Sequence, residues 1–188
     1  GTARQGVAEG TDRQDVAAGA AREGVVEGIA RQDVAEGSYH QALALFQEAV
    51  AVFEGLRHRE NRAWVLGPLG LAARGAGETA LVHEFVIEAL ETGVDLGAFM
   101  PVMYALPVAA LLLADQGAVE RAVEVYACAA RHGFVANSCW FEDVAGRPIA
   151  AATTLPPADL EAARERGQAQ EWDVMAAELL TELEDPGE

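Results

Sequence analysis

Lysine is absent from this chain, and all 13 of its basic residues are arginines. A lysine Schiff base and the lysine of a phosphate-binding loop are therefore excluded. Cysteine is also scarce, and two cysteines in 188 residues cannot form a disulfide framework. Against the 13 arginines stand 30 acidic residues, which give a net charge of −17. Such a chain repels phosphate groups, so nucleic acid and anionic membranes are poor partners.

What is present is a largely apolar chain of moderate length. Hydrophobic residues make up 51% of the 188 positions, enough for one core or a short repeat array. The chain begins with Gly1-Thr2, without a methionine and without a signal-peptide pattern. We therefore expect a fragment of a longer, cytoplasmic protein.

A nine-residue repeat opens the sequence. Each of its four copies starts with arginine and carries a valine three positions later, at Val7, Val16, Val25 and Val34. Nine residues make about two and a half turns of helix, so successive valines would fall on opposite faces of a continuous helix. Such a helix has no single strong apolar face. We expect residues 1–21 to form an N-terminal arm, either helical or frayed.

A second, longer repeat has a period of 40 residues, marked by Gly37, Gly77 and Gly117. The positions five, nine and twelve after each glycine are apolar and lie on one face of a helix. They are Ala42, Phe46 and Ala49 in the first copy, Val82, Val86 and Ala89 in the second, and Ala122, Tyr126 and Ala129 in the third. Another apolar helix precedes each glycine, so the predicted unit is helix, glycine turn, helix.

Residues Gly37 to Ala49 resemble the second helix of a tetratricopeptide repeat. The pattern is Gly-x-Tyr-x-x-Ala-x-x-x-Phe-x-x-Ala. The 40-residue period departs from the usual 34 and resembles the longer repeats in the sensor regions of bacterial signal-transduction ATPases of the maltose-regulator type. The resemblance implies an all-α, right-handed solenoid of antiparallel helix hairpins, with about three hairpins over residues 22–134.

The last third of the chain departs from the repeat, and we expect residues 135–188 to form a helical cap with an acidic tail. A helix is predicted over residues 134–144, and another begins at Pro156-Pro157 and stops at Gly167. The last predicted helix carries an apolar stripe of Trp172, Met175, Leu179 and Leu183. Within the preceding repeat, Pro107 predicts a break or kink in the helix that reaches Asp115.

The resemblance also implies a concave groove lined by the first helix of each hairpin. Carried over by register, the groove positions are Arg31, Trp64, Leu71, Arg74, Tyr104 and Leu111. Trp64 and Tyr104 are 40 residues apart, so they would stack as a ladder. Aromatic residues and arginine are typical binding anchors. Equally open is the alternative that Trp64 and Tyr104 only pack between helices.

Candidate catalytic and metal-binding residues are few. Cys128 and His132 would share a helical face, with Cys139 close in sequence, and two thiolates with an imidazole could bind zinc. No fourth ligand is evident, and a free cysteine such as Cys128 is more often a small core residue. Glu142 and Asp143 would raise rather than lower the pKa of the Cys139 thiol. We therefore expect no enzyme activity, no metal and no cofactor.

The preferred function is a non-enzymatic scaffold in a larger bacterial signalling regulator. It would bind a protein segment or a small effector in the groove. One alternative is a self-association module that forms homo-oligomers through the nine-residue repeats. A further alternative is a small helical metalloenzyme that uses Cys128, His132 and Cys139.

Overall fold

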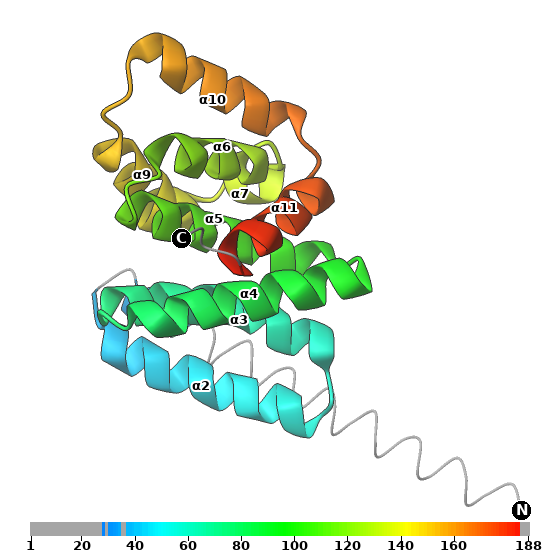
Figure 1. The fold of residues 1–188 in the computed structure, drawn as a ribbon. Helices are drawn as coiled ribbons and strands as arrows, with labels where there is room; N and C mark the ends of the chain where they lie inside the picture. The colour runs from blue at the N-terminus through cyan, green and yellow to red at the C-terminus, as the bar shows by residue number, and fades with distance from the viewer. Residues whose placement is uncertain (1–27, 29, 35–36, 185–188) are drawn as a thin grey trace, which may run out of the picture.

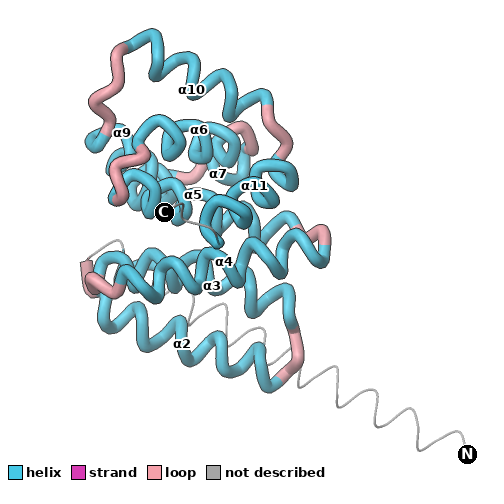
Figure 2. Tube along the Cα trace, viewed as in Figure 1, coloured by secondary structure: helices cyan, strands magenta, loops and turns pink. Residues whose placement is uncertain are grey.

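The computed structural model describes residue 28, residues 30–34 and residues 37–184 (Figure 1). This part of the chain is all-α, as predicted: helices joined by short turns, without a strand (Figure 2). The predicted arm of residues 1–21 lies outside the described residues. The longer helices are α2 (Tyr39–Gly55), α3 (Arg59–Gly75), α4 (Thr79–Leu96), α5 (Phe99–Asp115), α6 (Val119–Ala130), α10 (Pro157–Ala169) and α11 (Trp172–Glu184). Between α6 and α10 lie α7 (Gly133–Ala136), α8 (Cys139–Phe141), the π-helix η1 (Glu142–Gly146) and α9 (Arg147–Ala152).

The turns that precede each helix from α2 to α6 repeat every 20 residues. A left-handed residue ends each helix, with φ between 57° and 85°, at Gly37, Arg57, Gly77, Gly97 and Gly117. After each one, the next backbone N–H donates to the carbonyl five residues back, as from Glu78 to Ala73 at 2.9 Å. This is the Schellman motif, which satisfies carbonyls at a helix end and favours glycine. The predicted glycine turns are confirmed, and the turns recur at half of the 40-residue period.

The regular turns place the helices in an alternating arrangement. Each helix from α2 to α6 packs against the next one, and α3 also packs against α5 (Figure 1). The predicted apolar face of α2, α4 and α6 is confirmed, because its residues are buried apart from the partly exposed Tyr126. Burial is far more complete in α5, where every residue from Pro101 to Leu113 is buried. Helices α3 and α5 therefore form the centre of the core.

Glycine allows α3 and α5 to touch at the backbone. A Cβ added at Gly67 would lie 2.6 Å from the Cβ of Tyr104, and one at Gly70 would lie 3.0 Å from Val108. The predicted break before Pro107 is wrong, because α5 runs unbroken through it. Proline inside a helix costs about 3 kcal/mol. Burial of α5 on all sides offsets that cost.

The chain that follows α6 differs from the prediction in two places. Residues 134–144 do not form one helix but are divided among α7, α8 and η1. Gly167 does not stop α10, which continues to Ala169. Instead Gly167 is buried where α10 crosses α6, and a Cβ there would collide with the carbonyl of Glu124. The missing side chain serves a close helix contact rather than a helix end.

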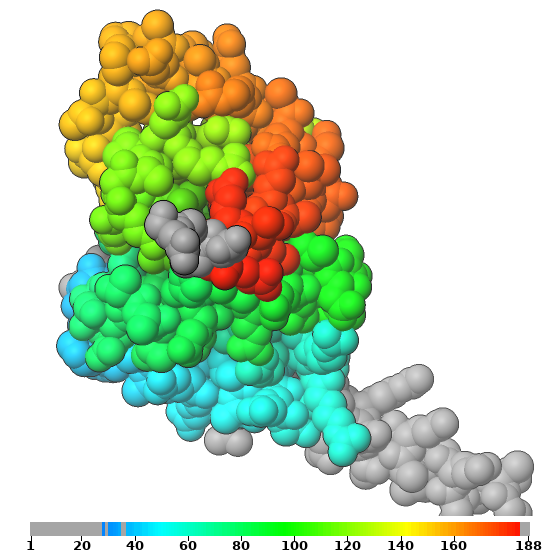
Figure 3. Space-filling view, viewed as in Figure 1, coloured from blue at the N-terminus to red at the C-terminus, as the bar shows by residue number. Residues whose placement is uncertain are grey.

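Helix α11 returns to the repeat helices. Its predicted stripe is confirmed, with Met175, Leu179 and Leu183 buried, and α11 lies across α4 (Figure 3). Arg121 of α6 pairs with Glu178 and Glu182 of α11 at 3.3 and 2.7 Å. These contacts join the C-terminal helix to the middle of the repeat helices. Within the described residues, no helix is both long and apolar enough to cross a membrane.

Candidate functional site

Apart from Arg31, which lies in helical residues 30–34 before α2, the residues predicted to line a groove lie on the faces of α3 and α5 opposite the layer of α2, α4 and α6. The 40-residue spacing puts Trp64 of α3 beside Tyr104 of α5, with ring centroids 5.7 Å apart and planes at 68°. Such an edge-to-face pair adds about 0.5–1.5 kcal/mol beyond the area it buries. Tyr104 is only 2% exposed, whereas Trp64 is half-buried. The predicted aromatic ladder is therefore present.

This face is covered by residues 133–152, here called the crossing segment, which contain α7, α8, η1 and α9. Three aromatic side chains of the segment gather around Tyr104. The centroid of the Tyr104 ring lies 5.4 Å from that of Phe134, 5.3 Å from Phe141 and 6.3 Å from Trp140. Together with Trp64 they form an aromatic cluster at the N-terminal half of α5.

Arg31 closes the aromatic cluster from the N-terminal side. Its guanidinium carbon lies 4.5 Å from the centroid of the Trp140 ring and 5.7 Å from that of Tyr104. The indole N–H of Trp140 donates to the carbonyl of Arg31 at 3.4 Å. A cation over aromatic faces contributes about 0.5–2 kcal/mol, depending on how dry the site is. Helical residues 30–34, α3, α5 and the crossing segment therefore meet at one point.

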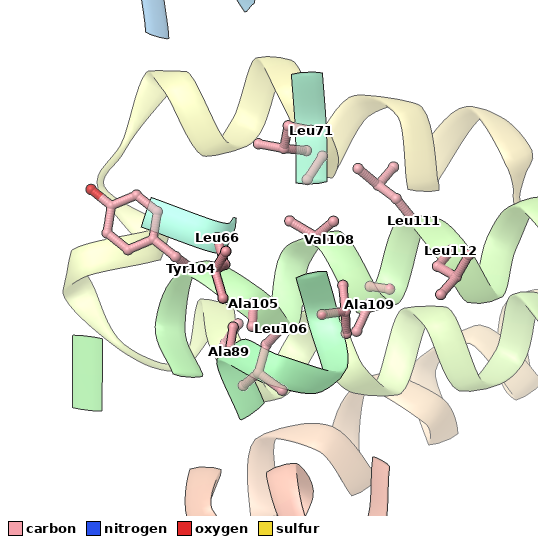
Figure 4. Packing of buried hydrophobic residues seen from close by; sticks show 14 of the residues in the cluster. Leu66, Leu71, Ala89, Tyr104, Ala105, Leu106, Val108, Ala109, Leu111 and Leu112 are labelled. Atoms are coloured by element: carbon pink, nitrogen blue, oxygen red, sulfur yellow. The ribbon is translucent and has the colours of Figure 1, made fainter. Parts of the chain in front are cut away.

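Farther along the same face, Leu71 and Leu111 are 5% and 1% exposed. Figure 4 shows Val108 and Leu111 pointing toward the yellow ribbon of the crossing segment. A cavity of about 160 Å³ remains beside Leu71, and Val144 and Pro148 of the crossing segment help to line it. The segment therefore follows both the aromatic and the aliphatic part of the face.

Arg74 lies at the end of this cavity and holds α3 to α5. Its guanidinium donates two hydrogen bonds to the carboxylate of Asp115, at 2.6 and 2.7 Å. The hydrogen bonds to Asp115 raise the pKa of Arg74, against the opposing effect of burial. Two donors on one planar carboxylate fix the geometry as well as the charge. In this structure Arg74 is therefore a clamp between two helices.

The structure thus brings Arg31, Trp64 and Tyr104 together and places Leu71, Arg74 and Leu111 farther along the same face. In the described residues that face is covered by the chain itself rather than open, and its binding of a partner stays a prediction. The sequence analysis missed Phe134, Trp140 and Phe141. A signal was available, because three of the chain's aromatic residues (three Trp, three Tyr and six Phe) fall within eight positions.

The candidate metal ligands do not converge. Cys128 is buried, and its thiol lies 3.5 Å from the carbonyl of Gln170. Burial raises the pKa of this thiol to about 11. The His132 ring packs edge-on against Phe99 at 5.2 Å, and Cys139 is exposed. In the part of the chain that the structure describes, no three His, Cys, Asp or Glu side chains are arranged to hold a metal ion.

Comparison with known proteins adds no relative: no family model, curated protein or solved structure matches this chain significantly.

Proposed function

We propose that this chain is a non-enzymatic scaffold whose α3–α5 face binds a helical protein segment that carries aromatic side chains. The observation that carries the proposal is the occupant already on that face. The chain's own crossing segment places Phe134, Trp140 and Phe141 around Tyr104. A face that accepts one aromatic helical segment has the shape and chemistry to accept another.

The crossing segment is suited to displacement. It is divided into helices of 4, 3, 5 and 6 residues, whereas α3 and α5 have 17 residues each. Phe134 remains 38% exposed even in the covered state. Val135, Phe141, Ala145 and Ile149 of the segment are buried, so a partner must supply apolar side chains of its own in their place. A partner helix that does so can replace the crossing segment without unfolding α3 or α5.

Trp64 offers a further point of recognition. Its buried indole nitrogen has no hydrogen-bond partner among the described residues. An unsatisfied buried donor costs about 1–3 kcal/mol. A partner segment that presents a carbonyl or a side-chain oxygen to this N–H recovers that free energy, which favours exchange.

The alternating helices α2 to α6 support a right-handed, TPR-like solenoid as the architecture behind this face. In each pair a central helix, α3 or α5, packs against both outer neighbours. With the resemblance of Gly37 to Ala49, this arrangement favours a sensing module in a larger bacterial, cytoplasmic signalling regulator. Displacement of the crossing segment would move α10 and α11, which follow it in the chain, and so carry the signal. Self-association through residues 1–21 stays a separate prediction, because that arm lies outside the described residues.

The test uses a fluorescent peptide of residues 133–152 and the full chain. In the wild-type chain the tethered segment competes at an effective concentration of the order of millimolar. Added peptide at micromolar concentration should therefore bind poorly. The double variant Phe134→Ala, Trp140→Ala weakens the tethered segment but leaves α3 and α5 intact. We expect this variant to bind the wild-type peptide at least tenfold more tightly, measured by fluorescence anisotropy.

Two further variants make the result specific. Trp64→Ala added to the double variant removes the α3 aromatic residue against which the peptide would pack, and it should abolish the gain in peptide affinity. Trp172→Ala removes an aromatic residue that packs against Phe99 outside the cluster, and it should leave peptide binding as in the wild type. If the double variant is folded by circular dichroism and binds no better than the wild type, the proposed exchange is refuted.

A further inference from the structure

A cavity of about 400 Å³ lies between α6, the crossing segment and α10, away from the aromatic cluster. Figure 1 shows the helices α6, α9 and α10, whose residues line it. Its walls are apolar where Val123, Ile149 and Leu160 contribute, and polar where Tyr126 and Glu142 contribute. Ligand sites of proteins have volumes of roughly 300–1,000 Å³, with mainly apolar walls and a few polar groups. The cavity has both properties.

Two of the polar residues that line the cavity, Glu142 and Tyr126, converge over a glycine, and Arg164 and Gln168 also contribute to the lining. A Cβ built on Gly146 would lie 2.5 Å from Oε2 of Glu142 and 2.7 Å from the hydroxyl oxygen of Tyr126. Both oxygens therefore approach the same side of the Gly146 backbone. A side chain at position 146 would collide with them, so glycine is what allows Glu142 and Tyr126 to come together at the cavity wall.

A π-helical turn sets this geometry. Residues Glu142–Gly146 form η1, and the N–H of Arg147 donates to the carbonyl of Glu142, five residues earlier. Glu142 and Gly146 are four residues apart and therefore lie on the same side of the turn. Single π-turns are rare and occur frequently at functional sites.

Both oxygens act as acceptors near neutral pH. Tyr126 donates its hydroxyl hydrogen toward the carbonyl of Phe141, at a long 3.5 Å, which leaves its lone pairs for a donor in the cavity. Burial, and secondarily the charge of Glu142, raises the pKa of Tyr126 to about 12, so the phenol stays neutral. Glu142 adds a negative charge. The net charge of −17 further attracts cations to the chain.

We propose that this cavity binds a small organic cation, a protonated primary amine with an apolar body. The ammonium group donates hydrogen bonds to the Glu142 carboxylate and to the Tyr126 hydroxyl oxygen above Gly146. The apolar body lies against Val123, Ile149 and Leu160. Arg164 also lines the cavity, but it pairs with Glu161 at 3.8 Å, whereas Glu142 has no ion-pair partner among the described residues. The unpaired carboxylate of Glu142 therefore favours a cation over an anion. The cavity is a different site from the α3–α5 face, but the crossing segment forms one of its walls, so the cavity exists only while that segment is in place.

The probe is 2-phenylethylamine, titrated into the full chain by isothermal calorimetry. The neutral isostere 2-phenylethanol and the anion phenylacetate measure the contribution of the charge. We expect the amine to bind at least tenfold more tightly than the alcohol and the anion to show no binding. Equal affinities for the amine and the alcohol would overturn the proposal.

Two variants that change the net charge equally distinguish binding at this site from general electrostatic attraction of the amine to the acidic chain. Glu142→Gln removes the proposed acceptor charge, whereas Asp143→Asn removes the neighbouring charge, which pairs with Arg147 at 2.6 Å. We expect Glu142→Gln to weaken amine binding at least tenfold and Asp143→Asn to change it less than twofold. An equal effect of both variants would show attraction by net charge alone and refute the site. Circular dichroism confirms that each variant is folded.

Discussion

Left-handed residues recur every 20 positions, and substitutions at two equivalent turns are predicted to change the stability of the protein in opposite directions. Four of the five positions are glycine, but the turn between α2 and α3 uses Arg57 at φ 57°. The left-handed conformation strains any residue that has a Cβ. We therefore expect Gly77→Ala to destabilise the protein and Arg57→Gly to stabilise it, although both residues occupy the same position in successive turns.

The magnitude follows from two opposing contributions. A left-handed residue with a Cβ costs about 1–2 kcal/mol. Replacing glycine by alanine also reduces the entropy of the unfolded chain, which recovers about 0.4–1 kcal/mol. The net effect is a loss of about 1 kcal/mol for Gly77→Ala and a gain of similar size for Arg57→Gly. No steric term complicates Gly77→Ala, because an added Cβ meets no heavy atom within 4 Å.

Urea unfolding followed by circular dichroism at 222 nm measures both variants, and thermal melts provide a second estimate. For a protein of this size, about 1 kcal/mol shifts the midpoint temperature by roughly 2–4 °C. Arg57→Ala is the matched control, because it removes the long side chain and keeps the strain. We expect its stability to equal that of the wild type. A loss of stability in Arg57→Gly, or a gain in Gly77→Ala, would refute the account of the turns.

Three further outcomes follow from the packing of α6 and from burial. Gly167→Ala should destabilise the protein by at least about 2 kcal/mol in urea unfolding, because the new Cβ would collide with the carbonyl of Glu124; wild-type stability would contradict the close contact. A maleimide should label Cys139 rapidly and Cys128 only in denaturant, since Cys139 is exposed and Cys128 is buried with its pKa raised to about 11; mass spectrometry that finds two fast sites would contradict this. The pKa of Tyr126 is raised from 10 to about 12, so its contribution to stability is present below pH 10 and is lost as the pH rises through 12; Tyr126→Phe should flatten the stability profile over that window.

Local sequence rules predicted the regular part of the fold. A glycine at the left-handed end of a helix and apolar residues at helical spacing are local constraints, so Gly37, Gly77 and Gly117 and the buried face of α2, α4 and α6 could be predicted without the structure. The 20-residue spacing of the turns was not predicted, because Arg57 rather than a glycine occupies the left-handed position between α2 and α3. The stripe of α11 was predicted for the same local reason.

Tertiary packing decided the points at which those rules failed. Pro107 breaks a helix that stands alone, but α5 is buried on every side, and its packing offsets the cost. Gly167 matches the pattern of a helix stop, yet it serves the close crossing of α10 over α6. In each case one residue type has two structural uses, and only the neighbouring helix determines which one applies.

The sequence alone therefore determined the buried faces of α2, α4 and α6, the turns at Gly37, Gly77 and Gly117 and the aromatic pair of Trp64 and Tyr104, because these depend on residues at fixed spacing. Only the tertiary structure decided what covers that pair. Contacts between Tyr104 and the crossing segment join residues 30 to 37 positions apart, and the bond between Trp140 and Arg31 spans 109. An apolar pattern predicts that a face is buried but not which element of the chain covers it, because the hydrophobic effect is non-directional.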